Sequence, residues 1–135
     1  RVFPNASLFA EKEIARLLTD AGIVRHRGKI ESTINNAARA LDMVRTEGSL
    51  AGFVWRYEPS PASRPDRLDW ATLKLMGKTA ESVALSRDLR KRGWTFVGPT
   101  TMYAFMQSAG VVNDHVDGCF CRREIERARG TFKRP

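Results

Sequence analysis

The sequence of 135 residues contains few cysteines and no long hydrophobic run. Its two cysteines, Cys119 and Cys121, are one residue apart, which is poor spacing for a mutual disulfide because bridged Cα atoms need a defined separation. A disulfide framework is therefore excluded, and a reducing cytoplasm is the compartment that fits best. No apolar run is long enough to cross a membrane, and no basic segment followed by an apolar one predicts a secretory signal.

Acidic residues are scarce relative to basic ones. The chain has 15 Asp and Glu against 23 Lys and Arg, so its formal net charge is +8 at pH 7. Such a surplus attracts polyanions, which makes nucleic acid the expected partner. A solvated basic surface without such a partner is the alternative. The hydrophobic content of 42% is ordinary for one folded domain, which we expect to be a monomer.

Apolar residues recur at helical spacing in several segments, so the sequence predicts an all-α fold. The predicted helices cover residues 10–20, 30–45, 79–92 and 99–109. The buried stripe of the last helix is predicted to comprise Met102, Phe105, Met106 and Ala109.

Three other segments are expected to differ from these helices. Residues 50–57 carry aromatic side chains that we interpret as core, with a pocket wall as the alternative. Residues 59–69 contain three prolines, which predict a loop. Residues 122–135 hold six basic residues against two acidic ones and few large apolar side chains, so we expect a weakly ordered basic tail.

Residues 79–110 form a helix–hairpin–helix pattern, in which Thr79 can cap the first helix and Pro99 can begin the second. The glycine-containing turn at 93–98 exposes backbone N–H groups, and the following helix adds its positive dipole end, so together they suit a phosphate. A plain packed helical hairpin is the alternative. The candidate DNA-binding residues, taken from the turn and from the basic junction before residue 30, are Arg25, Arg27, Lys29, Lys91, Arg92, Thr95, Gly98, Thr100 and Thr101.

Residues 113–121 hold both cysteines and one of the two histidines, His115. Thiolate and imidazole are ligands that zinc prefers, but a structural zinc site needs four ligands. At most three are present here, because His26 lies far upstream and is better explained as a helix-start contact or a phosphate neighbour. The segment is therefore half of a metal site or no metal site.

Three blocks resemble the DNA-3-methyladenine glycosylase I family. They are DAGIVRHRGKI at 20–30, KRGWTFVGPT at 91–100, and YAFMQ at 103–107 followed by NDH at 113–115 and Cys119. The resemblance, over about 3–121, implies an all-helical helix–hairpin–helix glycosylase. Such an enzyme hydrolyses the N-glycosidic bond of 3-methyladenine flipped out of double-stranded alkylated DNA and leaves an abasic site. A non-catalytic DNA-binding or structural module that keeps the hairpin is the alternative.

The resemblance also implies a structural zinc held by four ligands, of which His115 and Cys119 match two. We interpret Cys121 as a packed or free thiol. The other two ligands are expected to precede Arg1, in an N-terminal segment of the family that also supplies the pocket glutamate and most of the aromatic residues around the base. Glu58 and Glu81 do not match that glutamate, so no catalytic residue is assigned.

We therefore expect residues 1–121 to be the C-terminal part of a single glycosylase domain, inactive and unstable by itself, with residues 122–135 as its tail. A zinc-dependent hydrolase would need an open coordination position and an activated water. The closed site that the resemblance implies argues against that class.

Overall fold

The computed structural model describes residues 11–135, and every regular element in that range is helical. The elements are α1 (Glu11–Thr19), α2 (Arg27–Glu47), α3 (Leu50–Trp55), the short 3₁₀ helix η2 (Pro61–Ser63), α4 (Trp70–Leu75), α5 (Ala80–Lys91), α6 (Pro99–Ser108) and α7 (Arg122–Thr131). The all-α prediction is confirmed. Residue 10, where the first helix was expected to begin, lies outside the described residues. No helix within residues 11–135 is long and apolar enough to span a membrane.

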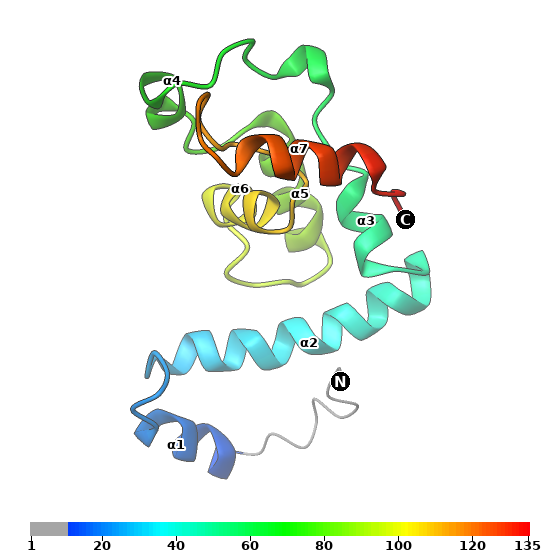
Figure 1. Ribbon diagram of the computed structural model, residues 1–135. Helices are drawn as coiled ribbons and strands as arrows, with labels where there is room; N and C mark the ends of the chain where they lie inside the picture. The colour runs from blue at the N-terminus through cyan, green and yellow to red at the C-terminus, as the bar shows by residue number, and fades with distance from the viewer. Residues whose placement is uncertain (1–10) are drawn as a thin grey trace.

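The α5–α6 pair forms the centre of the fold. Figure 1 shows α2 as a long helix along one edge, with α1 beyond it and the α5–α6 pair between α2 and α7. The core is built where α2, α3, α5 and α6 meet, and its most deeply buried apolar side chains include Met43, Phe53, Leu85 and Met106. The hairpin between α5 and α6 therefore rests on a packed helical support.

Side-chain caps explain where the helices begin. Thr79 and Ser82 form a capping box at the start of α5, since each side chain accepts from the other residue's backbone N–H. The His26 Nδ1 accepts from the Lys29 N–H at 3.2 Å and so caps α2, which confirms the helix-start interpretation of this histidine. The start of α6 is different: Pro99 is its first residue, as predicted, and Gly98 offers no side chain to cap it.

The prediction of a weakly ordered tail is wrong, because residues 122–131 form α7. Arg129 anchors the helix: its side chain is only 16% exposed, donates to the Gly110 carbonyl and pairs with Glu58 at 2.9 Å. Beyond the helix, the Phe132 ring lies 4.9 Å from the Trp55 ring. The tail is ordered because its arginines pair with the Glu58 carboxylate and its Phe132 ring packs on the Trp55 ring, both from distant parts of the chain.

Two smaller expectations also need correction. The loop over 59–69 contains η2, and α4 follows it directly. In α6, Phe105 is 42% exposed and Ala109 is exposed, while Tyr103 is 3% exposed and belongs to the core. The buried stripe of α6 is rotated because the Tyr103 hydroxyl has a carboxylate partner inside the fold, Asp114.

Candidate nucleic-acid interface and metal centre

The turn between α5 and α6 is held from one side by polar side chains of α2. The Asn36 amide donates to the Thr95 carbonyl at 2.9 Å and accepts from the Thr95 N–H at 3.0 Å. The Ser32 hydroxyl oxygen accepts from the Thr95 hydroxyl at 2.8 Å, and the Asn35 amide donates to the Gly93 carbonyl at 2.9 Å. These contacts give the inner backbone groups of the turn their hydrogen-bond partners, so its outer side is left for a ligand.

From the other side, α5 fixes the turn through Ser86. This serine is 1% exposed, and its hydroxyl donates to the Val97 carbonyl at 2.6 Å. Val97 itself is 5% exposed and packs in the core. The turn is therefore clamped between α2 and α5 just before α6 begins.

The N-terminus of α6 has donors without protein acceptors. Within residues 11–135, no acceptor takes the backbone N–H of Thr100 or Thr101, whereas the Met102 N–H bonds to the Gly98 carbonyl at 2.8 Å. A Cβ at Gly98 would lie 3.7 Å from an Arg90 guanidinium nitrogen and 3.9 Å from the Thr101 hydroxyl. Two N–H groups, a hydroxyl and a guanidinium thus converge at the positive end of a helix, which is the chemistry of a phosphate site.

The cations predicted to bind DNA differ in how they are paired. Arg92 bonds Glu47 at 2.6 Å and lies over the Phe53 ring at 4.9 Å. Arg27 pairs with Glu11 at 2.7 Å, and Lys91 approaches Asp88 at 3.9 Å. Each of these three cations has a carboxylate beside it in the fold.

The remaining predicted residues are placed more openly. Within residues 11–135, no ion pair involves Arg25, Lys29 or Arg90, and all three are exposed. Of the hydroxyl residues, Thr95 is engaged with Ser32, while Thr100 and Thr101 stand at the start of α6. The role of each predicted residue in DNA binding stays a prediction.

Sequence reasoning missed the polar residues of α2 that hold the turn, which are Ser32, Asn35 and Asn36. It counted Arg90 in the basic end of the first hairpin helix but did not separate it from Arg92. A signal for the asparagines was present, because two consecutive Asn residues are unfavourable inside a long helix. Such residues are kept where their side chains bond backbone groups of another segment. Nothing local distinguished Arg90 from Arg92, since both end the same basic run.

The candidate zinc ligands are close together. The Cys119 Sγ lies 3.5 Å from the His115 Nδ1. Two ligands of one tetrahedral zinc, with ordinary Zn–S and Zn–N bonds, are about 3.6 Å apart, so the pair fits the metal. Within residues 11–135, no group of three or more His, Cys, Asp or Glu could hold a metal ion. Burial and the neighbouring Cys119 raise the pKa of the Cys121 thiol, which disfavours the thiolate that a zinc ligand requires.

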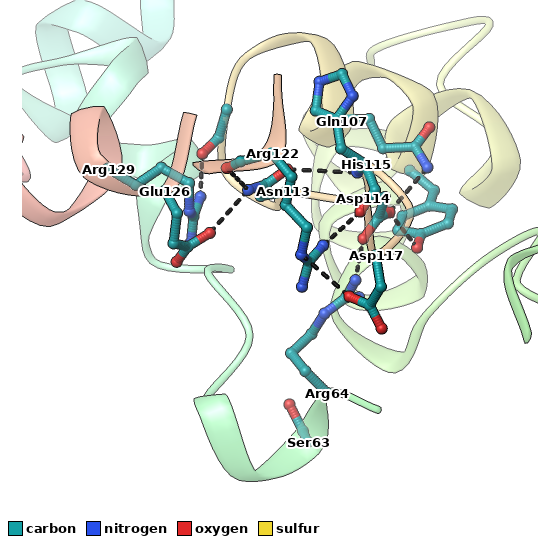
Figure 2. Close-up of polar contacts among 12 residues, drawn as sticks. Ser63, Arg64, Gln107, Asn113, Asp114, His115, Asp117, Arg122, Glu126 and Arg129 are labelled. Carbon is teal, nitrogen blue, oxygen red and sulfur yellow. Dashed lines mark hydrogen bonds and ion pairs between the residues drawn. The ribbon is translucent and has the colours of Figure 1, made fainter. Parts of the chain in front are cut away.

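A polar network holds the residues that precede His115 (Figure 2). Asp114, whose side chain is 6% exposed, pairs with Arg64 and accepts from the Tyr103 hydroxyl at 2.5 Å and the Gln107 amide at 2.8 Å. Burial, followed by the hydrogen bond to Asp114, raises the pKa of Tyr103. The network ties the 113–121 segment to α6.

The start of α7 closes the same segment from the other side. Asn113 donates to the Arg122 carbonyl at 3.1 Å and to Glu126 at 2.8 Å, while Arg122 donates to the His115 carbonyl and pairs with Asp117 at 3.2 Å. Figure 2 shows these contacts converging on the His115 loop. The loop that carries the zinc candidates is therefore positioned before any metal binds.

A cavity of about 610 Å³ lies between α7, the loop after α3 and residues 111–113. Four arginines line it, but each has an acidic partner: Arg64 pairs with Asp114, Arg122 with Asp117, and both Arg129 and Arg134 with Glu58. The cavity therefore differs from the start of α6, where the guanidinium of Arg90 has no acidic partner within residues 11–135.

Comparison with known proteins decides the family. The model of the methyladenine glycosylase family matches residues 4–122. The chain belongs to this family. It is 45% identical over 112 residues to DNA-3-methyladenine glycosylase 1 of Escherichia coli K12, which covers 82% of the chain and 58% of that relative. It is 37% identical over 125 residues to DNA-3-methyladenine glycosylase of Haemophilus influenzae, which covers 84% of the chain and 65% of that relative.

Solved structures of the family agree with the fold. A crystal structure of 3-methyladenine DNA glycosylase I superposes with a TM-score of 0.75 at 41% identity, covering 87% of this chain and 63% of that one. The chain thus spans about three-fifths of the length of these family members. The family match ends at residue 122, so α7 lies almost wholly outside it.

Proposed function

We propose that this protein acts in base-excision DNA repair as a monofunctional DNA-3-methyladenine glycosylase. It binds double-stranded alkylated DNA, takes up flipped 3-methyladenine and hydrolyses the N-glycosidic bond, leaving an abasic site. Membership of the methyladenine glycosylase family supports the reaction. The observation that carries DNA binding is the start of α6, where unpaired N–H groups and Arg90 converge at Gly98.

The described residues account for the binding step. The N–H groups of Thr100 and Thr101 and the guanidinium of Arg90 receive one backbone phosphate, a contact that positions the duplex without reading its sequence. Lys29 and Arg25, at the start of α2, extend the cationic surface. The alkylated base carries positive charge and leaves readily, so bond cleavage asks less of the protein than removal of a normal base. No residue of this chain is assigned to that cleavage.

The excision step is tested by counting abasic sites in methylated duplex DNA incubated with the product of the intact gene. We expect abasic sites on methylated duplex and none on unmethylated duplex. The 135-residue chain alone is expected to bind the duplex without excision. Binding without abasic sites in the intact gene product contradicts the enzyme proposal and favours a non-catalytic helix–hairpin–helix module. The experiment tests this alternative because the chain covers only 58% and 65% of the two glycosylases to which it was compared.

The binding step is tested with Arg90→Gln, measured by fluorescence anisotropy on a labelled duplex. We expect the dissociation constant to rise about tenfold, because a phosphate loses a charge-assisted hydrogen bond. The matched control is Arg87→Gln on the same helix, where the arginine is paired with Asp88. Equal effects of the two substitutions contradict a phosphate site at Gly98.

We further propose that His115 and Cys119 are two ligands of a closed structural zinc, with the remaining two ligands supplied from outside residues 11–135. Their 3.5 Å separation and their chemistry support this proposal. When bound, the metal would tie the 113–121 segment to the rest of the protein. Metal analysis of the intact gene product is expected to show zinc that is lost in His115→Ala and Cys119→Ser but kept in Cys121→Ser. Loss in Cys121→Ser as well contradicts the assignment.

We propose a cytoplasmic monomer as the working state.

A further inference from the structure

Phe96 has an unusual backbone conformation. It is the only non-glycine residue within 11–135 with positive φ, at 55°. A bulky side chain is rarely found there, because its Cβ crowds the following carbonyl. The ring is nevertheless 57% exposed, so full burial does not compensate for the strain. Strained backbone of this kind persists where the surrounding structure imposes it, often at functional sites.

The surroundings of Phe96 impose the strain. Thr95 is held by Asn36 on one side, and the Val97 carbonyl is held by Ser86 on the other, so the intervening residue has little freedom. A glycine at this position would adopt the same backbone conformation without steric cost. What the phenylalanine adds is therefore its ring.

The ring lies between two helix starts. Its centroid is 6.3 Å from the His26 ring in an edge-on arrangement, and its Cζ would lie 3.7 Å from a Cβ at Gly28. Along the chain, Phe96 is two residues before Gly98, where the proposed phosphate site begins. Exposed Arg25 and Lys29 flank the His26 side. The apolar ring thus stands within a cationic surface made by segments about 70 residues apart in the sequence.

We propose that Phe96 contacts DNA directly and packs its exposed ring on a deoxyribose of the strand whose phosphate binds at the start of α6. This inference rests on the proposed DNA binding. Charge complementarity identifies the occupant, because exposed Arg25 and Lys29 lie next to His26 in the chain and Arg90 lies beside Gly98, and such cations suit a polyanion. A sugar is the apolar surface next to each phosphate, and the clamped turn keeps the ring in place to receive it.

The test uses the full chain and the variants Phe96→Asn and Phe96→Gly, since both residues tolerate the left-handed conformation. On a labelled duplex we expect the dissociation constant to rise about tenfold, as burial of an apolar ring face is lost. The dependence of affinity on salt should stay unchanged, because no charge is removed. The melting temperature should stay equal or rise by a few degrees, because the strain is relieved.

The matched control is Trp70→Asn, which removes a 74% exposed aromatic ring on α4 and should leave binding unchanged. Unchanged binding in both Phe96 variants overturns the inference, as does a loss of binding that only follows a fall in melting temperature. If Arg90→Gln weakens binding while Phe96→Asn does not, DNA binding at α6 stands and the role of Phe96 falls. If the unmodified chain binds no duplex, both proposals fail.

Discussion

Asn36 contributes two hydrogen bonds at the centre of the hairpin support. Its amide donates to the carbonyl and accepts from the N–H of the same residue, Thr95, at 2.9 and 3.0 Å. We predict that Asn36→Ala lowers the free energy of unfolding by about 2 kcal/mol, because the Thr95 N–H loses its acceptor and the Thr95 carbonyl keeps only the Ser32 hydroxyl at 3.2 Å. Urea denaturation measures the change. Asn35→Ala, which removes one bond to the Gly93 carbonyl, should cost less, and an equal or larger loss there contradicts the prediction.

Both tyrosines of the sequence donate to carboxylates, which should suppress their ionisation. Tyr57 donates to Asp88 at 2.7 Å, and burial followed by this bond raises the pKa of Tyr57 to about 12. Tyr103, bonded to Asp114, also has a raised pKa. A pKa raised on folding means that the stabilisation is complete below the ordinary value of 10.0 and is lost as pH rises toward 12.

A spectrophotometric titration checks this behaviour. The folded chain should show little tyrosinate absorbance at pH 10, whereas the same chain unfolded in urea should be about half ionised there. Half-ionised tyrosine in the folded chain at that pH contradicts the two hydrogen bonds.

At the scale of elements, α7 shows how a charged segment becomes ordered. The Glu58 carboxylate pairs with Arg129 at 2.9 Å and with Arg134 at 2.7 Å. The hydrogen bond from Arg134 contributes most to lowering the pKa of Glu58 below its ordinary value of 4.5. A pKa lowered on folding means that the stabilisation is present above the ordinary value and is lost as pH falls below it. Docking of α7 should therefore weaken below about pH 4.5.

Hydrogen exchange along α7 measures this docking. Glu58→Gln should remove protection of α7 already at pH 7, because two guanidinium groups lose their carboxylate. Glu81→Gln is the control, since the Glu81 carboxylate has only a 3.5 Å contact with Ser63. Protection that persists in Glu58→Gln contradicts the prediction and shows that the contacts of α7 with Gly110, Asn113 and Trp55 are sufficient to hold it.

At the scale of the whole molecule, the net charge of +8 attracts DNA, and the number of cations that contact phosphates sets how strongly binding depends on salt. If Arg25, Lys29 and Arg90 contact phosphates, the logarithm of the association constant should fall with a slope of about −3 against the logarithm of salt concentration. Arg90→Gln should reduce the magnitude of this slope by about 1. A slope near zero contradicts phosphate binding, and a much steeper slope shows that the paired cations also take part.

Much of the fold follows from local pattern. The 79–110 region was predictable because Thr79 caps its own helix, Pro99 suits the first turn of the next helix, and Gly93 and Gly98 mark the turn between the two helices. The buried face of α6 was only partly predictable, because Tyr103 is buried through a hydrogen bond to Asp114, which follows α6 in the chain. Local periodicity counts a tyrosine as neutral and cannot show that its hydroxyl has an internal partner.

The sequence by itself determined the helical class, the hairpin, the family resemblance and the pairing of His115 with Cys119 in one short segment. The helices, the hairpin and the 113–121 segment each depend on residues within a few turns of one another, and the resemblance depends on three such local blocks. Only the tertiary structure decided that Arg92 is paired while Arg90 is open, and that the basic tail is a docked helix. The partners are distant: Glu47 lies 45 residues from Arg92, and Glu58 lies 71 residues from Arg129. Ion pairing and burial depend on which segments meet in space, so no local window contains them.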